Sequence, residues 1–294
     1  MVYDNNEVIC VEILQLKYFK DAAETQNFSK TAQKFGVPTS AVSQSIRRLE
    51  NEMGTDLFER SSNRISLNED GRTLYLAVCR MGKQLEDTRR LFADHSGELS
   101  GEVRLQISCN RRVVSDVIRQ FSQMHPKVTF VLKHGTGADS EGFDLVISDD
   151  ERLKERYEKT ELIREQIAVA FPKNHPLVGK STLRIKDLAQ EPFVTMQPGE
   201  RLHHLTQSLC MQAGFFPKIA IQCDDPYYIR KYIEMGLGIG FVPMFSWRGQ
   251  LEELVCKPLK GVERTTYAFW DPGRYMSKAT RAFLELLKQM CSCE

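Results

Sequence analysis

Several features that mark common classes of protein are missing from this chain of 294 residues. No apolar run approaches the ~20 residues needed to cross a bilayer. The N-terminus, MVYDNNEVICVEIL, starts acidic and has no basic segment before its apolar one, so it is a poor signal peptide. We therefore expect a cytoplasmic protein with no membrane partner.

Cysteine and histidine are present, but not in the patterns that bind metals. The 8 cysteines are scattered, with no CxxC and no Cys/His cluster at zinc spacing, and the 6 histidines show no metal spacing. In a cytosolic protein most such cysteines are small buried hydrophobic residues or inert thiols. We expect no metal site and no other cofactor.

Motifs of the common enzyme classes are also lacking. The chain has no Gly-rich phosphate loop ending in Lys-Ser/Thr and no GxSxG elbow. GLGIGF, at 236–241, is reminiscent of a dinucleotide loop, but it follows a predicted helix and leads into a predicted strand. That order is the reverse of the one that places a pyrophosphate on a helix N-terminus. We expect no catalytic residues and no enzyme.

Composition allows a soluble globular protein and says little about its partners. Hydrophobic residues make up 41% and charged residues 27% of the chain, which is long enough for two domains with separate cores. The formal net charge is only +1, and charges in the N-terminal third nearly cancel. Any affinity for nucleic acid must therefore be argued from local geometry.

Three short helices are predicted near the N-terminus. The first is indicated by apolar residues at roughly helical spacing, namely Leu14, Leu16, Phe19, Ala22 and Ala23. Ser29 is a good N-cap for a second helix, SKTAQKF, which Gly36 ends. Thr39 or Ser40 can cap a third helix that runs to about Met53. Two helices joined by a tight turn containing glycine form a helix-turn-helix.

The third predicted helix has two contrasting faces. One is an apolar stripe of Val42, Ile46, Leu49 and Met53. The other is a polar face of Ser40, Ser43, Gln44 and Arg47. No carboxylate occurs between Thr39 and Arg48, so these groups can donate to base edges or phosphates without repelling the duplex. The alternative is an ordinary solvated helix face.

A predicted hairpin follows in GTDLFERSSNRISLNEDG. Leu57-Phe58 and Ile65-Ser66-Leu67 form two short strands around a polar tip, with Arg60 and Arg64 beside it. A basic hairpin after a recognition helix is a wing, placed to touch the flanking sugar-phosphate backbone or minor groove.

The segment from AETQNFSK to SLNEDG, including its RRLE and LFxR stretches, resembles the DNA-binding domain of LysR-type regulators. The resemblance implies base and phosphate contacts from Thr39, Ser40, Ser43, Gln44 and Arg60; to these we add Arg47 and Arg64. Family members often have Gln-Pro at Thr39-Ser40 and Arg at Gln44, so the preferred DNA sequence does not transfer.

A long helix is predicted from Glu69 to about Asp94. Six residues along it step by 4, 3, 4, 3, 4, which is a coiled-coil seam: Leu74, Val78, Met81, Leu85, Thr88 and Phe92. The seam could instead pack on its own domain, but the resemblance favours a dimer contact that spaces two recognition helices on a two-fold DNA site. We expect a homodimer or homotetramer on an imperfect inverted repeat in a promoter, with RNA polymerase as a candidate further partner.

After Gly101, β-rich runs alternate with helical ones, which predicts a doubly wound α/β sheet. Two clusters, before and after IAVAFPKNHPL, indicate two subdomains with a cleft between them. AVAFPKNHPL, KDLAQEPFV and IEMGLGIGFVP resemble the LysR-type effector domain, which is similar to periplasmic solute-binding proteins. HGTGADSEG is too short for the crossover helix that the family usually has.

The expected fold is therefore α+β and multidomain. A winged helix-turn-helix spans 1–68, a linker and dimerisation helix with a hinge spans 69–100, and an effector domain spans 101–294.

The cleft is the expected ligand site, because strand ends that lead into helices offer free N–H groups to anions. Two such ends supply the candidate effector contacts Ser108, Asn110, Arg111, Thr195 and Gln197. They could also be plain capping and turn residues, but the resemblance places inducers there. We expect an unidentified small anion as the effector.

Two other interpretations stay open. The winged helix-turn-helix argues against a stand-alone solute-binding protein. A thiol-based redox sensor would have Cys210 and Cys223 as its nearest candidates, although no recognisable redox motif surrounds them.

Overall fold

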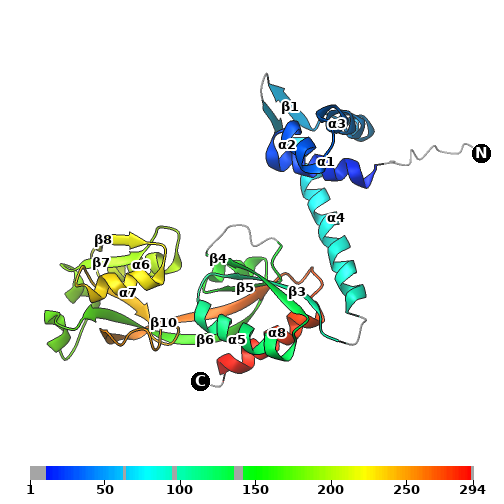
Figure 1. The fold of residues 1–294 in the computed structure, drawn as a ribbon. Coiled ribbons are helices and arrows are strands. Elements are labelled where there is room, and N and C mark those ends of the chain that lie inside the picture. The colour runs from blue at the N-terminus through cyan, green and yellow to red at the C-terminus, as the bar shows by residue number, and fades with distance from the viewer. Residues whose placement is uncertain (1–10, 62–63, 95–97, 136–141, 293–294) are drawn as a thin grey trace, which may run out of the picture. The chain divides into compact units, whose positions relative to one another are not determined.

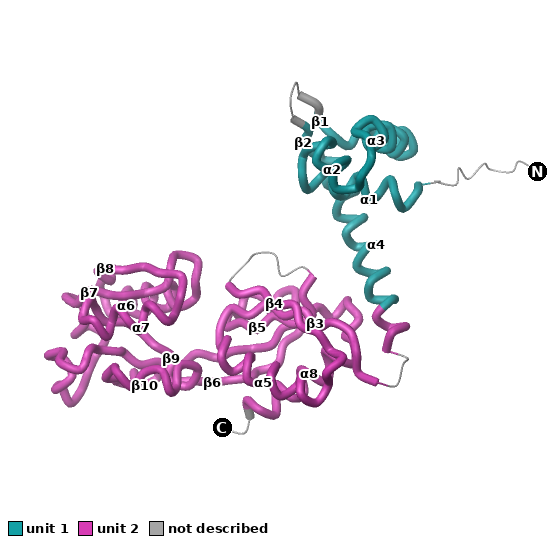
Figure 2. The backbone as a smooth tube through the Cα atoms, viewed as in Figure 1, with its two compact units in different colours: residues 1–89 teal, residues 90–294 magenta. Residues whose placement is uncertain are grey.

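The computed structural model describes residues 11–61, 64–94, 98–135 and 142–292. The chain forms two compact units, Met1–Arg89 and Arg90–Glu294 (Figure 2). None of the described helices has the length and apolar character that a membrane span requires.

The first unit contains three short helices, a hairpin and most of a long helix (Figure 1). These elements are α1 (Ile13–Thr25), α2 (Phe28–Phe35), α3 (Thr39–Met53), β1 (Phe58–Ser61), β2 (Arg64–Leu67) and α4 (Glu69–Ala93). Their shared core includes Phe19, Ile46 and Leu49, which are fully buried. The predicted helix-turn-helix, hairpin and long helix are all confirmed.

Helix α2 begins at Phe28, earlier than predicted, and its N-cap is Asn27 rather than Ser29. The Asn27 Oδ1 accepts hydrogen bonds from the backbone N–H groups of Ser29 and Lys30, at 2.9 and 3.1 Å. An amide oxygen at this position satisfies donors that the first helical turn leaves free. Gly36 ends the helix as predicted, with a φ of 66° in the left-handed region that favours glycine.

Helix α3 also differs at its start. The cap position is Pro38, and Thr39 is already the first helical residue, so neither Thr39 nor Ser40 is the N-cap. The extended φ and ψ of Pro38 (−61° and 146°) suit a residue that precedes a helix. Both hydroxyl side chains therefore lie on the first turn of α3 and are exposed.

The second unit contains two subdomains joined by two long strands. The first subdomain has β3 (Gly101–Ile107), α5 (Arg111–Met124), β4 (Val128–His134), β5 (Leu145–Ser148) and the C-terminal α8 (Lys278–Ser292). The second has β7 (Pro192–Met196), α6 (Arg201–Gln212), β8 (Lys218–Cys223), α7 (Pro226–Glu234) and β9 (Gly240–Pro243). The joining strands are β6 (Glu158–Pro172) and β10 (Leu254–Trp270).

The sheet that holds this unit together is mixed. Its order is β4-β3-β5-β10-β6-β9, with β3 parallel to β4 and β5, and with β10 antiparallel to β5 and β6. Strands β7 and β8 form a separate parallel pair, which a single bridge between Phe193 and Ile239 ties to the end of β9. The shared strands β6 and β10 thus connect the two subdomains.

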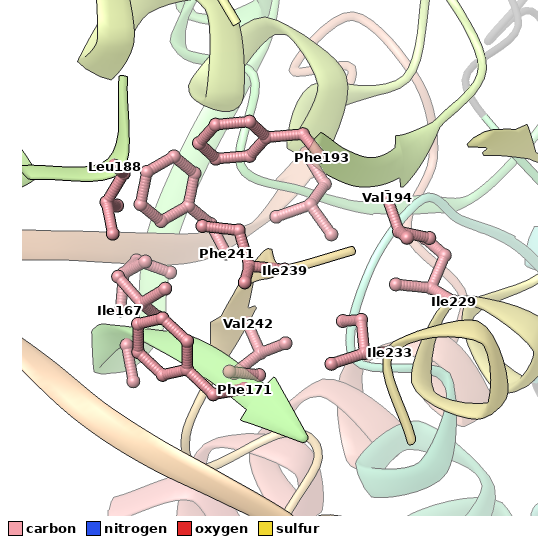
Figure 3. Close-up of a cluster of buried hydrophobic side chains, with 14 of the residues drawn as sticks. Ile167, Phe171, Leu188, Phe193, Val194, Ile229, Ile233, Ile239, Phe241 and Val242 are labelled. Carbon is pink, nitrogen blue, oxygen red and sulfur yellow. The ribbon is translucent and has the colours of Figure 1, made fainter. Parts of the chain in front are cut away.

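Each subdomain has its own hydrophobic core. Leu105, Phe121 and Phe283 belong to the first core, and Phe193 and Phe241 belong to the second, which Figure 3 shows. Two separate cores confirm the predicted pair of subdomains. The short connection predicted between β4 and β5 includes 136–141, which lie outside the described residues.

Candidate functional site

Helix α3 presents the predicted polar face on the surface of the first unit. Val42, Ile46 and Leu49 have no exposed surface, so they fix the rotation of the helix. On the other side Thr39, Ser40, Gln44 and Arg47 are exposed, and Ser43 is half-buried. The structure therefore brings these five predicted DNA contacts together on one carboxylate-free face.

The hairpin is tied firmly to α3. Phe58 packs edge-on against Phe19 and Phe28, with ring centroids 5.6 and 5.4 Å apart. The buried Glu50 carboxylate accepts a hydrogen bond from the backbone N–H of Leu57 at 3.0 Å. These contacts fix where the strands emerge relative to the polar face.

Two predicted contacts, Arg60 and Arg64, belong to the strands of this hairpin. Arg60 pairs with Ile65, and Arg64 pairs with Ser61. The side chains of both arginines lie outside the described part of the structure, so their contacts with DNA stay a prediction.

A second surface feature of this unit is an apolar groove between α1 and α4. Its volume is about 490 Å³, and its lining includes Ile13, Leu16, Met81 and Leu85. Met81 is 54% exposed and Leu85 68% exposed, whereas Val78 of the same predicted seam is buried. Only the first half of the seam therefore packs on its own domain.

In the second unit a cavity of about 210 Å³ lies between the two subdomains. The first subdomain contributes Ser108, Asn110 and Arg111, all three of them predicted effector contacts. Asn110 has a φ of 56°, and its Nδ2 donates to Thr266 Oγ1 at 2.6 Å. Within the described residues its Oδ1 is buried without a hydrogen-bond partner.

The other two predicted contacts, Thr195 and Gln197, are described but are not part of this lining. Thr195 is buried beneath α6, with its hydroxyl 3.3 Å from that of Thr206. Gln197 is exposed in the loop after β7. It is Met196, between them, that lines the cavity.

A buried ionic group that the sequence did not indicate lies where the long strands pass between the subdomains. Arg264 on β10 donates to Glu165 on β6 at 2.5 Å, and it forms a second, longer ion pair with Asp149 Oδ2 at 3.8 Å. The Glu165 carboxylate also accepts from the backbone N–H of Ser246 at 2.8 Å. No local motif marks these residues, because they meet only through the sheet.

Arg201, at the start of α6, extends this group across the cleft. Its Nε lies 3.5 Å from Asp149 Oδ1, and its Nη2 donates to the Asp149 carbonyl at 3.3 Å. A longer contact of 3.9 Å reaches Asp150. The second subdomain is thus joined to the first by an ion pair.

Three of the described cysteines in this unit have raised thiol pKa values. Burial raises the pKa of the Cys210 thiol to about 11 and, together with the nearby Asp149 carboxylate, that of Cys109 to about 12. Burial also raises the pKa of Cys223. Because the thiolate is the reactive form, these shifts argue against a redox sensor built on Cys210 and Cys223.

Comparison with known proteins agrees with these features. Residues 13–72 match the family described as "Bacterial regulatory helix-turn-helix protein, lysR family", and residues 96–292 match "LysR substrate binding domain". The regulator ShiR of Corynebacterium glutamicum is 30% identical over 246 residues, which cover 78% of this chain and 81% of that protein. The transcriptional dual regulator GltC of Bacillus subtilis is 26% identical, over 96% and 98% of the two chains.

Solved structures show the same fold. The LysR family regulator CbnR in complex with its target DNA has a TM-score of 0.66 at 18% identity and covers 95% of this chain and 99% of that chain. Full-length BenM has a TM-score of 0.58 at 22% identity, over 96% and 97% of the two chains. This chain belongs to the LysR family of DNA-binding transcriptional regulators, whose C-terminal domain binds an effector.

Proposed function

We propose that the protein binds an imperfect inverted repeat in promoter DNA as a homodimer or as a tetramer built from such dimers. In this account α3 reads base edges in the major groove, and the hairpin touches the flanking backbone. The observation that carries the proposal is the α3 surface, where an apolar stripe is buried and the opposite face offers donors without a carboxylate. Such a protein acts in the bacterial cytoplasm, where it regulates transcription and is not an enzyme.

The groove between α1 and α4 is the surface that we assign to the second copy. Exposed apolar side chains that continue a coiled-coil seam are covered most simply by the same seam of another chain. The two-fold symmetry of such a pair matches the symmetry of an inverted repeat.

The cleft between the subdomains is our proposed effector site, and a small anion is the proposed effector. Ser108, Asn110 and Arg111 line the cavity and support the proposal. Thr195 and Gln197 stay predicted contacts. A ligand that binds one arrangement of the subdomains better than another shifts the population between them, which is the requirement for control of DNA binding.

The DNA contacts are tested by Ser43→Ala combined with Gln44→Ala. We expect the loss of ~1–3 kcal/mol of binding free energy for each base contact removed, with an unchanged thermal unfolding midpoint. The matched control is Ser208→Ala with Gln212→Ala, a hydrogen-bonded Ser and Gln pair on the exposed face of α6. Wild-type affinity of the α3 variant for its specific site would refute the assignment.

A further inference from the structure

Most charges around the cleft are already balanced within the protein. Three arginines and three carboxylates make ion pairs with one another: Arg152, Arg201, Arg264, Asp149, Asp150 and Glu165. This group is neutral as a whole. It therefore contributes no net attraction for a charged ligand.

The other charged residues of the lining carry a net positive charge. They are Arg111, Arg112 and Arg230, against Glu200 and Asp225. One positive charge is in excess, and in a half-buried site a charge attracts its counter-ion more strongly than it does in water. The cleft is thus matched to a ligand with a single negative charge.

Arg230 is the arginine best prepared to hold that charge. Its guanidinium lies over the ring of Trp247, 4.9 Å from the centroid. Among the described residues no carboxylate forms an ion pair with it, and the nearby Asp225 carboxylate accepts a hydrogen bond from the backbone N–H of Tyr227 at 2.7 Å. Burial lowers the pKa of Arg230, yet a guanidinium remains protonated in proteins, so the site keeps a charged, oriented donor.

The rest of the cavity is suited to an apolar body. Met196, Leu202, Pro226 and Tyr227 contribute apolar surface beside the arginine. The volume of about 210 Å³ is below the roughly 300–1,000 Å³ of sites for drug-sized ligands, so a single ring is the size that fits.

We propose that Arg230, stacked on Trp247, binds the carboxylate of a small aromatic monocarboxylate whose ring lies against the apolar side chains of the cleft. This inference rests on the proposed function of the cleft as the effector site. It names the ligand class and assigns its recognition to a stacked arginine rather than to the helix N-termini.

The chain offers a direct optical test, because its two tryptophans are Trp247 and Trp270. In a full-length Trp270→Phe variant, Trp247 is the sole indole emitter, and a carboxylate placed on Arg230 changes the field at that indole. We expect sodium benzoate to change the emission saturably. Benzamide, a neutral analogue of the same shape, and succinate, a dianion, should give no saturable change up to about 10 mM.

Variants in the same Trp270→Phe background test the arginine. Arg230→Gln should weaken benzoate binding by roughly tenfold or more, equivalent to about 1.4 kcal/mol. If the glutamine variant does not fold, Arg230→Lys replaces it as the test. This variant keeps the charge but loses the planar fork and the stacking, so it should weaken benzoate binding several-fold. Lys231→Gln is the control of equal charge, because Lys231 pairs with Glu234 at 2.8 Å and should leave the affinity unchanged.

Three results would overturn the inference: no saturable change with benzoate, tighter binding of succinate or benzamide than of benzoate, or wild-type benzoate affinity in both Arg230 variants. Specific DNA binding by the same protein is measured separately. If DNA binding persists while benzoate fails, the ligand class is wrong and the DNA-binding proposal stands. If DNA binding fails while benzoate binds through Arg230, the DNA-binding proposal is wrong and the ligand class stands.

Discussion

Glu165 is a buried carboxylate whose oxygens are all engaged by neighbouring donors. It accepts hydrogen bonds from the backbone N–H groups of Phe245 and Ser246, from the Ser246 hydroxyl and from Arg264. Although burial works against the charge of Arg264, the Glu165 carboxylate and nearby acidic groups raise its pKa. This single residue therefore holds the loop that precedes Trp247 onto the strands shared by both subdomains.

Glu165→Gln tests the importance of that pair. The substitution keeps the shape but leaves the buried Arg264 without its main counter-charge, so we expect a loss of about 3–5 kcal/mol in the free energy of unfolding. The control is Glu161→Gln on the same strand, where the exposed pair with Arg164 should contribute about 0–1 kcal/mol. Urea unfolding of the second unit measures both, and equal destabilisation by the two variants would contradict the account.

The direction in which a side chain points follows from the sequence pattern for helix α3 but not for the end of strand β7. The α3 face followed from periodicity alone, since Val42 and Ile46 had to point inward. At the end of β7 the sequence marked Thr195 but not which way its side chain points. Successive strand residues face opposite sides, and because Met196 faces the cleft, Thr195 faces α6 instead.

At the scale of elements, α4 changes role along its length. Leu74 and Val78 pack on the core of the first unit, whereas Met81, Leu85 and Phe92 remain exposed. The sequence alone left two interpretations of this seam. In the structure the first half of the seam packs on its own domain. The second half is exposed, and it is the part proposed to contact a second copy.

Met81→Glu combined with Leu85→Glu tests that contact. Two carboxylates without partners in a buried seam should weaken the dimer by several kcal/mol, so full-length protein should sediment as monomer where the wild type sediments as dimer. Neither residue is buried in the single chain, so the fold should be unaffected. Arg80→Glu makes the same change in net charge outside the groove lining and should remain dimeric. Dimers of the double variant as stable as those of wild type would exclude the seam.

The strands show how much of the second unit the sequence could reveal. The sequence predicted β-rich runs after Gly101, but the apolar run IAVAF is only a fragment of β6, which contains 15 residues. The missed portion of β6 carries charged residues such as Glu161 and Glu165, so it lacks a continuous apolar run. Long-range pairing with β10, which the sequence does not encode locally, keeps it extended.

At the scale of the whole molecule, two proposed functions are joined in one chain. The first unit has the face proposed to read DNA and the apolar groove proposed for a second copy, and the second unit has a cleft with one unbalanced positive charge. Control of DNA binding requires only that the effector has different affinities for two arrangements of the dimer. The family assignment came from sequence motifs, whereas the charge balance of the cleft needed the structure.

The most direct test of the central claim is selection of double-stranded oligonucleotides from a random pool by the purified full-length protein. The account predicts enrichment of an imperfect inverted repeat whose half-site centres lie about one helical turn, ~10 base pairs, or a multiple of it apart. It also predicts that the Ser43→Ala, Gln44→Ala variant does not enrich that repeat. Enrichment of no sequence, or of a repeat that this variant selects equally well, would contradict the account.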